Sequence, residues 1–150
     1  MMAKRETEPH RNDTRPDWDY VRVKVMRWAL RIKLAQNFRA FFQLLMSTGE
    51  QPIVEESQKD GFWGARAVGE ERLVGINVLG RLLMELRDRV TGEDRTGLFM
   101  VPPLAIPDFL LYGKPIEAVQ SAEGAVADAA ELVCGADLAV PKRRQMSGGS

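Results

Sequence analysis

The chain is almost without cysteine and histidine, which excludes several classes of protein. Its 150 residues hold one cysteine, Cys134, and one histidine, His10. A single cysteine excludes an internal disulfide framework and is typical of a reducing compartment. Zinc sites need clusters of His and Cys, and a Ser–His–Asp triad needs a histidine beside its nucleophile, so neither is expected. We therefore predict no metal site and a cytoplasmic protein.

Long apolar runs and net charge are missing as well. No apolar stretch approaches the roughly 18 residues that span a bilayer, and the polar segment 1–15 lacks the apolar core of a signal peptide. Basic and acidic residues number 21 each, so no overall field draws the chain to nucleic acid or anionic membranes. Residues 1–39 nevertheless hold ten Lys/Arg against five Asp/Glu, whereas 115–140 hold five acids and no base. This asymmetry indicates either a basic surface near the N-terminus or two solvated faces of opposite sign.

Hydrophobic periodicity predicts three helices, at residues 17–36, 37–47 and 77–90. In each helix, apolar residues recur at spacings of three and four and mark one buried stripe. Gly49 fits the left-handed position that ends the second helix, and Thr91-Gly92 ends the third. The expected inward residues are Val21, Val25, Trp28, Ala29 and Ile32 in the first helix, Phe38, Phe41, Phe42 and Leu45 in the second, and Leu79, Leu82, Leu83, Leu86 and Val90 in the third.

The remaining segments predict little regular structure. Residues 52–56 read as a short strand in a small sheet, and 57–74 as a long loop of the kind that often carries function. Residues 98–112 are apolar but broken by three prolines, so we expect an extended surface wrap that inserts Phe99, Leu104, Phe109 and Leu110. Residues 117–134 predict a weak alanine-rich helix with Val119, Val126, Ala130 and Val133 on one side.

These patterns give an α+β, mainly helical fold with a small sheet and a proline-rich C-terminal wrap. We expect residues 1–16 to be disordered, 17–116 to form the domain, and 117–150 to hold the weak helix and a flexible tail.

Two carboxylates on the predicted strand are the first candidate site residues. Glu55 and Glu56 are neighbours, so their side chains should point to opposite faces, one of them toward the interior or a cleft. An inward carboxylate needs a partner, which makes it either a functional group or half of a salt bridge to an arginine at the core edge. Asp60 presents the same choice, because an aspartate before Gly61 often serves only to cap a turn.

The loop and the helix after it hold the other candidates. Trp63 lies between glycines, and its indole offers a broad stacking face and one N–H donor; core filling is the alternative. Asn77 can cap the third helix. Because a helix N-terminus favours anions, this start could hold a phosphate with Gly75, Asn77 and nearby arginines, or the asparagine could serve as a cap alone. The arginines concerned are Arg66, Arg72 and Arg81.

Several spaced motifs resemble the C-terminal half of the NADAR (YbiA-like) family of N-glycosidases. The resemblance covers residues 18–89, nearly half of the chain. Its motifs are the helix Val25-Met26-Arg27-Trp28-Ala29-Leu30-Arg31-Ile32-Lys33, the turn and strand Ser47-Thr48-Gly49 and Ile53-Val54-Glu55, the loop Asp60-x-x-Trp63-Gly64, and the helix Gly75-x-Asn77-x-x-Gly80 with Leu83-Met84-x-x-Arg87.

The resemblance implies hydrolysis of N-glycosidic bonds in ribosyl compounds. Family members act on ribosylamino-pyrimidine phosphates of riboflavin biosynthesis, or resemble antitoxins that remove ADP-ribose from guanine in DNA. Such chemistry passes through a cation-like ribosyl state. It needs a carboxylate, a water molecule and residues that bind the leaving base. By analogy, Glu55 or Asp60 would stabilise charge or position water, and Trp63, Gly64, Asn77 and Arg81 would bind substrate, without metal or organic cofactor.

The family's N-terminal half, with its aromatic-rich opening and a catalytic glutamate, has no counterpart in residues 1–16. The resemblance therefore also fits a truncated reading frame, half of a split enzyme or a degenerate remnant. Apolar surface on the first and third helices should then be exposed and bind a protein that supplies the missing half. The alternative to catalysis is a protein-interaction or ADP-ribose-binding module, and the sequence does not choose between modified DNA and riboflavin intermediates.

Overall fold

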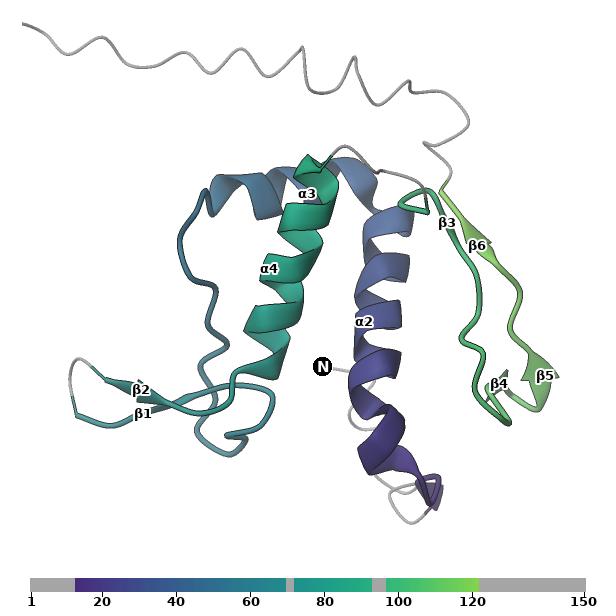
Figure 1. The fold of residues 1–150 in the computed structure, drawn as a ribbon, viewed down its shortest axis with the longest axis horizontal. Coiled ribbons are helices and arrows are strands. Elements are labelled where there is room, and N and C mark those ends of the chain that lie inside the picture. The colour runs from purple at the N-terminus through teal and green to yellow at the C-terminus, as the bar shows by residue number, and fades with distance from the viewer. Residues whose placement is uncertain (1–12, 70–71, 93–96, 122–150) are drawn as a thin grey trace, which may run out of the picture.

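The computed structural model describes residues 13–69, 72–92 and 97–121. In these ranges three helices and three antiparallel two-stranded sheets form an α+β, mainly helical fold, as the sequence predicts (Figure 1). The helices are α2 (Trp18–Gln36), α3 (Phe38–Ser47) and α4 (Val78–Thr91). The strands pair as β1 (Arg66–Ala67) with β2 (Leu73–Val74), β3 (Met100–Val101) with β6 (Val119–Gln120), and β4 (Leu110–Leu111) with β5 (Lys114–Pro115).

Helix α2 is the centre of the fold. It contacts α3 and α4 on one side and the β3–β6 pair on the other, while α3 crosses the end of α4 (Figure 1). The β1–β2 pair extends away beyond the start of α4. The three predicted helices are confirmed to within about one residue at each end. Gly49 has φ +52°, so the residue that ends α3 occupies the left-handed region that favours glycine.

The core lies where the three helices meet. The residues at its centre share near-complete burial: Leu30, Leu34, Phe38, Phe41, Leu45, Leu82, Leu86, Val90 and Leu98. The stripes predicted for α3 and α4 are confirmed, with Phe42, Leu79 and Leu83 packed at the edge of this core. The stripe predicted for α2 is wrong in part, because Ala29 is exposed and Leu30 and Leu34 carry the buried face.

Contacts on both sides of α2 explain that error. Trp28 faces the C-terminal segment, where its Nε1 donates to the carbonyl of Pro102 at 2.8 Å and its ring meets Phe109 edge-on at 4.8 Å. Leu34 faces the other helices and is fully buried. A helix covered on two sides has no single apolar stripe for periodicity to find.

The segment between α3 and α4 differs from the prediction. Residues 52–56 form no strand; a single parallel bridge joins Glu56 to Ala65. Residues 57–74 are not a structureless loop, since β1 and β2 pair within them with Arg66 opposite Val74. The predicted strand is missing because a side chain, that of Asn77, takes the place of a neighbouring strand on one edge of the segment.

The C-terminal segment also requires two corrections. Leu110 was expected to point inward, but it is exposed in β4, at the tip of a short hairpin. Val119 was expected in a helix, but it lies in β6 and pairs with Val101 of β3. This pairing forms because Val101 is fully buried against α2, which gives the returning chain an apolar strand to follow. The rest of the predicted helix, with Val126, Ala130 and Val133, lies outside the described residues, as do residues 1–12 of the predicted N-terminal tail and the C-terminal tail.

Exposed apolar side chains lie elsewhere than expected. The sequence predicts them on the first and third helices, yet among the described residues only Tyr20 of these two helices is a large hydrophobic residue with high exposure. The others cluster mainly on the β1–β2 hairpin and its flanks, and on the β4 turn: Val54, Val68, Leu73, Val74, Ile76, Leu110, Leu111 and Tyr112. The apolar stripes of α2 and α4, which the sequence predicts to be exposed, are buried because the two helices pack directly against each other. No helix among the described residues is long and apolar enough to cross a membrane.

Candidate functional site

Asp60 organises the loop that carries Trp63. Its Oδ1 accepts hydrogen bonds from the backbone N–H groups of Phe62 and Trp63, both at 2.9 Å. Its own N–H donates to the hydroxyl of Ser57 at 3.1 Å. This is the turn-capping geometry that aspartate favours. One carboxylate oxygen of Asp60 is therefore committed to holding the loop, and Oδ2 has no donor among the described residues.

Asn77 joins this loop to the segment before it. Asn77 stands at the start of α4 with φ +53°, but its side chain does not cap the helix. Instead, its Oδ1 accepts from the N–H of Glu55 at 3.0 Å, and its Nδ2 donates to the carbonyl of Ile53 at 2.8 Å. The capping role predicted for Asn77 is wrong. Asparagine tolerates the left-handed region, so it can turn the chain and bind the neighbouring backbone at once.

Three glycines let these backbones touch. A Cβ on Gly64 would lie 2.4 Å from the carbonyl oxygen of Glu55, and one on Gly75 would lie 2.3 Å from that of Gly64. A Cβ on Gly80 would lie 2.1 Å from the carbonyl oxygen of Ile53. Any side chain at these positions would force the segments apart. The Trp-Gly and Gly-x-Asn-x-x-Gly motifs thus describe a tight crossing of three backbone segments.

The start of α4 is closed to anions. Its first N–H groups have no partner within the helix and would be free for a phosphate. Here the N–H of Val78 donates to Phe62 O and that of Leu79 to Trp63 O, each at 3.0 Å, and the N–H of Asn77 donates to Gly64 O at 3.1 Å. The anion cradle predicted for this helix start is therefore wrong, because the loop already occupies the donors.

Trp63 lies half-buried between the loop and the helical core. It packs against the central cluster and meets Phe62 edge-on, with ring centroids 5.1 Å apart. The guanidinium of Arg22, from α2, stands 3.7 Å above the centre of the Phe62 ring, a cation–π contact. The indole is therefore neither free in solvent nor sealed in the core, and a cationic and aromatic cluster borders it.

The charged candidates lie on the surface around this unit. Glu55 and Glu56 are both exposed, so the expectation that one of them faces the interior is wrong. The cause is the irregular backbone, which lacks the alternation of a strand. Arg81 is exposed on the first turn of α4. Within the described ranges no group of three His, Cys, Asp or Glu side chains is placed to hold a metal ion.

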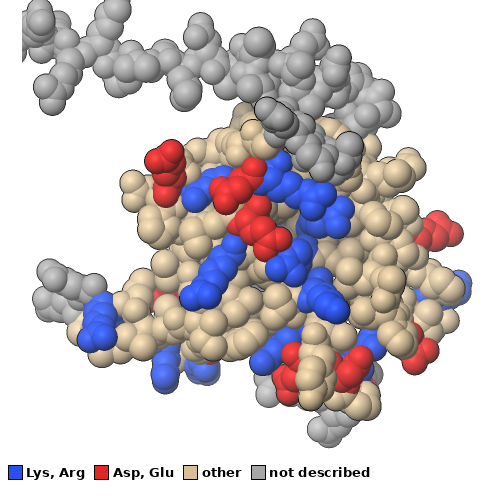
Figure 2. All heavy atoms as spheres, in the orientation of Figure 1, with Lys and Arg blue, Asp and Glu red and all other residues tan. Residues whose placement is uncertain are grey.

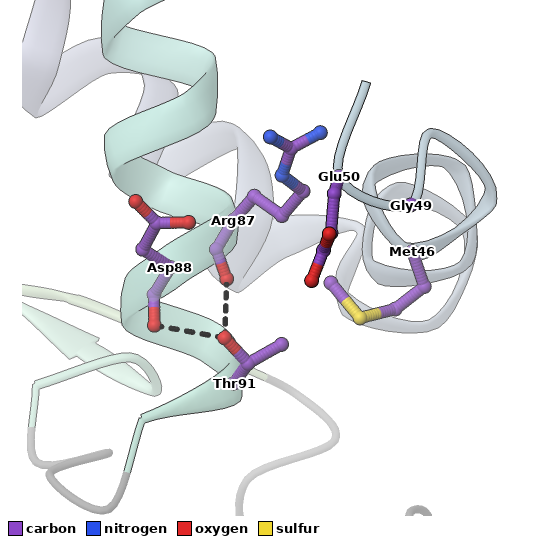
Figure 3. A pocket seen from close by; sticks show the side chains of 6 residues that line it. All are labelled: Met46, Gly49, Glu50, Arg87, Asp88 and Thr91. Atoms are coloured by element: carbon purple, nitrogen blue, oxygen red, sulfur yellow. Dashed lines mark hydrogen bonds between the residues drawn. The ribbon is translucent and has the colours of Figure 1, made fainter. Parts of the chain in front are cut away.

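A cavity of about 430 Å³ lies away from these residues, between the end of α3 and the last turns of α4 (Figure 3). Arg87 forms one wall: its side chain is 9% exposed, and its Nη1 donates to the hydroxyl of Thr48 at 2.7 Å and the carbonyl of Gln51 at 2.9 Å. Figure 3 shows Glu50 and Asp88 beside it. The cavity is lined by Met46, Gly49, Glu50, Arg87, Asp88 and Thr91.

Sequence reasoning missed what Arg87 does. It appears only as the last letter of a family motif, although it follows Leu83 by four residues and precedes Val90 by three, on the inner side of α4. A charged residue beside an apolar stripe signals a buried polar contact. The contact of Arg22 with Phe62 had no such signal, because the two residues come from separate segments.

Comparison with known proteins places these motifs in one family. The model of the NADAR domain matches residues 1–91. The N-glycosidase YbiA of Escherichia coli is 38% identical over 95 residues, which cover 62% of this chain and 55% of YbiA. A riboflavin biosynthesis protein of Vibrio vulnificus is 43% identical over 76 residues, covering 51% of this chain and 19% of that protein. The chloroplastic riboflavin biosynthesis protein PYRR of Arabidopsis thaliana is 42% identical over 79 residues, which cover 53% of this chain and 12% of PYRR.

The chain thus spans about half the length of the YbiA relatives and less than a fifth of the riboflavin proteins. No solved structure is significantly similar to it.

Proposed function

Because the chain belongs to the NADAR domain family, we propose that it takes part in hydrolysing the N-glycosidic bond of a ribosyl-phosphate compound. The observation that supports this most directly is the joint placement of Asp60, Trp63, Gly64 and Asn77 in one hydrogen-bonded unit at the start of α4. The names of the relatives, an N-glycosidase and riboflavin biosynthesis proteins, favour a ribosylamino-pyrimidine phosphate as substrate. The proposed domain is residues 17–116.

Glu55 is the carboxylate best placed to act on substrate in this proposal. Its backbone is held on both sides, by the Asn77 side chain and by Ala65, whose N–H donates to the Glu55 carbonyl at 2.8 Å. Its side chain is exposed and has no partner among the described residues. A carboxylate on a fixed backbone can stabilise a developing ribosyl cation or orient a water toward it. Asp60, with one oxygen engaged in the loop, acts here as a positioning residue.

Trp63 and Arg81 supply recognition in the same proposal. The half-buried indole offers an edge and part of a face to a planar leaving base. Arg81 lies one helical turn after Asn77, exposed and without a partner among the described residues, which suits a phosphate. A carboxylate, a water and a bound base suffice for the reaction, so the proposal includes no cofactor.

Matched carboxylate variants test this proposal. Release of free base and ribose 5-phosphate would be measured with a ribosylamino-pyrimidine phosphate, and release of ADP-ribose with ADP-ribosylated guanine. Glu55→Gln should lower turnover by about 10²-fold or more, the scale of general acid–base catalysis. Glu56→Gln removes an adjacent, equally exposed charge and should change turnover less than twofold, or about 0.4 kcal/mol. Equal losses in both variants would show that Glu55 has no special role.

A binding role is the second candidate, and the β1–β2 hairpin favours it. Val68, Leu73, Val74 and Ile76, which lie on the hairpin or within two residues after it, are 46 to 55% exposed. Such an apolar surface fits contact with further polypeptide, and the YbiA relatives extend well beyond the matched region. We propose that polypeptide corresponding to the rest of the family domain covers it. Leu73→Glu should then abolish co-elution with the N-terminal half of a YbiA relative, whereas Val54→Glu, outside the hairpin, should not.

ADP-ribose binding without hydrolysis would favour a reader over an enzyme.

A further inference from the structure

Arg22 of α2 stands over an aromatic ring of the loop that carries Trp63. Its guanidinium carbon lies 3.7 Å from the centre of the Phe62 ring. Cation–π attraction extends to about 6 Å from a ring centre, so this contact is a close one. The hydrogen bonds that Phe62 and Trp63 make to Asp60 and to the start of α4 involve backbone groups alone. The contact with Arg22 therefore acts on a side chain that those bonds leave free.

The Phe62 ring is the main partner of the Arg22 guanidinium. Nη1 of Arg22 lies 3.3 Å from Oδ1 of Asp19, one turn earlier on α2, but Asp19 is 80% exposed and such ion pairs contribute little. Nε of Arg22 is buried and bonds to no acceptor among the described residues. A buried donor without an acceptor is unfavourable, so the contact with the ring has to offset this cost.

The charged surface of α2 does not by itself explain this contact. Figure 2 shows that Lys and Arg side chains gather on the face formed by α2 and α4, with acidic side chains among them. Arg27 makes a two-pronged contact with Glu85, at 2.8 and 3.0 Å, and Lys24 is exposed. Arg22 instead has its guanidinium against a ring that touches a candidate binding residue.

Phe62 transmits this constraint to Trp63. The two rings meet edge-on, with centroids 5.1 Å apart and planes at 85°. Asp60 and the first amides of α4 fix the backbone of both residues, so only their side-chain torsions remain variable. A cation on the face of Phe62 limits rotation of that ring, and the ring in turn limits rotation of the indole.

The indole of Trp63 keeps a hydrogen-bond donor for a ligand. Its Nε1–H bonds to no acceptor within the part of the chain that the structure describes, and this atom is not sealed from solvent. An indole N–H can only donate, and the edge of a pyrimidine base offers acceptor oxygens. The orientation of the indole decides whether its ring and its N–H can meet the same base.

We propose that Arg22 is a positioning residue for the leaving base of the substrate. Through Phe62 it orients the indole of Trp63, so that the ring packs on a planar pyrimidine and the N–H donates to an acceptor of that pyrimidine. Arg22 acts on the base through Phe62 and does not contact the phosphate. The proposal rests on the glycosidase function and extends it, because it names the part of the substrate that this cluster binds.

Binding of two partial ligands to the full chain tests the proposal. Diaminouracil represents the planar base and ribose 5-phosphate the rest of the substrate, and titration calorimetry gives a Kd for each. We expect Arg22→Gln to weaken the Kd for diaminouracil about tenfold, the scale of one lost aromatic contact, and to leave that for ribose 5-phosphate within about twofold. Arg22→Lys keeps a cation over the ring and should lie between the wild type and Arg22→Gln. Lys24→Gln removes an exposed charge from the same helix and is the matched control, with both Kd values within about twofold of wild type.

A double-mutant cycle shows whether Arg22 acts through Phe62. Phe62→Leu removes the ring and should weaken the Kd for diaminouracil about as much as Arg22→Gln. In the Phe62→Leu background, Arg22→Gln should add less than about twofold, because the ring through which it acts is gone. Urea unfolding checks that each variant is folded under the conditions of the titration. If Arg22→Gln does not fold, Arg22→Lys takes its place in the cycle.

The indole signal in an NMR spectrum gives a readout that needs no ligand. In an isotope-labelled chain, the Nε1–H signal of Trp63 is identified by its loss in Trp63→Phe. We expect Arg22→Gln to shift or broaden this signal, since the indole then samples more than one orientation, and Lys24→Gln to leave it unchanged. If the wild type binds neither partial ligand, the glycosidase proposal loses its support, whereas this signal still decides whether Arg22 orients the indole.

Three results would overturn this proposal. The first is an indole signal of Trp63 that is the same in Arg22→Gln and in the wild type. The second is an equal effect of Arg22→Gln on the Kd for diaminouracil with and without the Phe62 ring. The third is a loss of ribose 5-phosphate binding in Arg22→Gln as large as the loss of diaminouracil binding, which would mean that Arg22 contacts the phosphate directly.

Discussion

The side chain of Asn77 holds the backbone of Glu55: the Glu55 N–H donates to Asn77 Oδ1 at 3.0 Å across 22 residues of sequence. The second half of the same amide donates to Ile53 O. One side chain therefore fixes both the position of a candidate carboxylate and the entry into α4. This contact accounts for an asparagine at a helix start where its side chain makes no cap.

Two substitutions at Asn77 should separate the contribution of its side-chain hydrogen bonds from that of its left-handed backbone conformation. Asn77→Ala leaves two backbone groups without partners and puts a Cβ residue in the left-handed region without side-chain compensation, so we expect a loss of about 2–4 kcal/mol in unfolding free energy. Asn77→Gly loses the hydrogen bonds but not the backbone conformation and should cost less. Urea unfolding measures both. Asn37→Ala, which removes an exposed amide that donates to Lys33 O, is the control and should cost under about 1 kcal/mol.

Gly80→Ala should destabilise the protein although alanine is the better helix former. The new Cβ would stand 2.1 Å from Ile53 O, a backbone atom that cannot rotate away. Overpacking of this kind costs about 1–3 kcal/mol, more than the gain of up to about 1 kcal/mol in helix propensity. Gly61→Ala has its nearest neighbour at 4.0 Å and should stay within about 0.5 kcal/mol of wild type. A higher melting temperature for Gly80→Ala would contradict the close crossing of α4 and the 53–55 segment.

Arg87→Met should loosen the turn after α3. The guanidinium donates to Thr48 Oγ1 and Gln51 O, and hydrogen bonds to charged donors contribute about 1.5–3 kcal/mol. We therefore expect a decrease of about 2–3 kcal/mol in unfolding free energy. Arg81→Met, on the exposed side of the same helix, should change it by less than about 0.5 kcal/mol. Similar losses in the two variants would mean that the buried contacts of Arg87 contribute little.

The start of α2 should add a weak pH dependence at acid pH. The Arg15 side chain, which donates two hydrogen bonds to Asp17, lowers the pKa of that carboxyl below its ordinary value of 3.8. A lowered pKa stabilises the fold above the ordinary value, and this stabilisation is lost as the pH falls through the lower folded-state value. The pair is exposed, so the effect is small. Urea midpoints of Asp17→Asn and Arg15→Gln should both lie under wild type at pH 6 and converge with it only well below pH 3.8, once the pH has passed the lower folded-state value. Midpoints that differ from wild type equally at both pH values would rule out this linkage.

The helices could be predicted because each of them carries a local pattern. In α4, Leu82, Leu86 and Val90 repeat at a spacing that only a helix places on one side, and all three are buried. The same reasoning failed in α2, where Trp28 and Leu34 face different partners. Periodicity describes one covered side, and no local signal tells how many sides of a helix are covered.

The candidate site could be predicted as a set of residues but not as a geometry. The spacing of Asp60, Trp63, Gly64 and Asn77 indicated a loop that closes on a helix, and these residues are joined there. The strand expected at 52–56 does not exist, since its partner is a side chain 22 residues away, which strand patterns do not describe. The geometry of the candidate site depends on contacts between segments that are distant in the sequence, and local patterns do not predict such contacts.

The loop that bonds to the first amides of α4 also governs how that helix can unwind. An ordinary helix frays from its first turn, where amides exchange with solvent almost freely. Here the amides of Val78 and Leu79 are covered by the carbonyls of Phe62 and Trp63, so their protons can exchange only when the loop detaches. Loop and helix therefore open as one cooperative piece. A ligand that binds the indole of Trp63 would hold the loop in place. It would therefore slow hydrogen exchange at the amides of Val78 and Leu79 without contacting them.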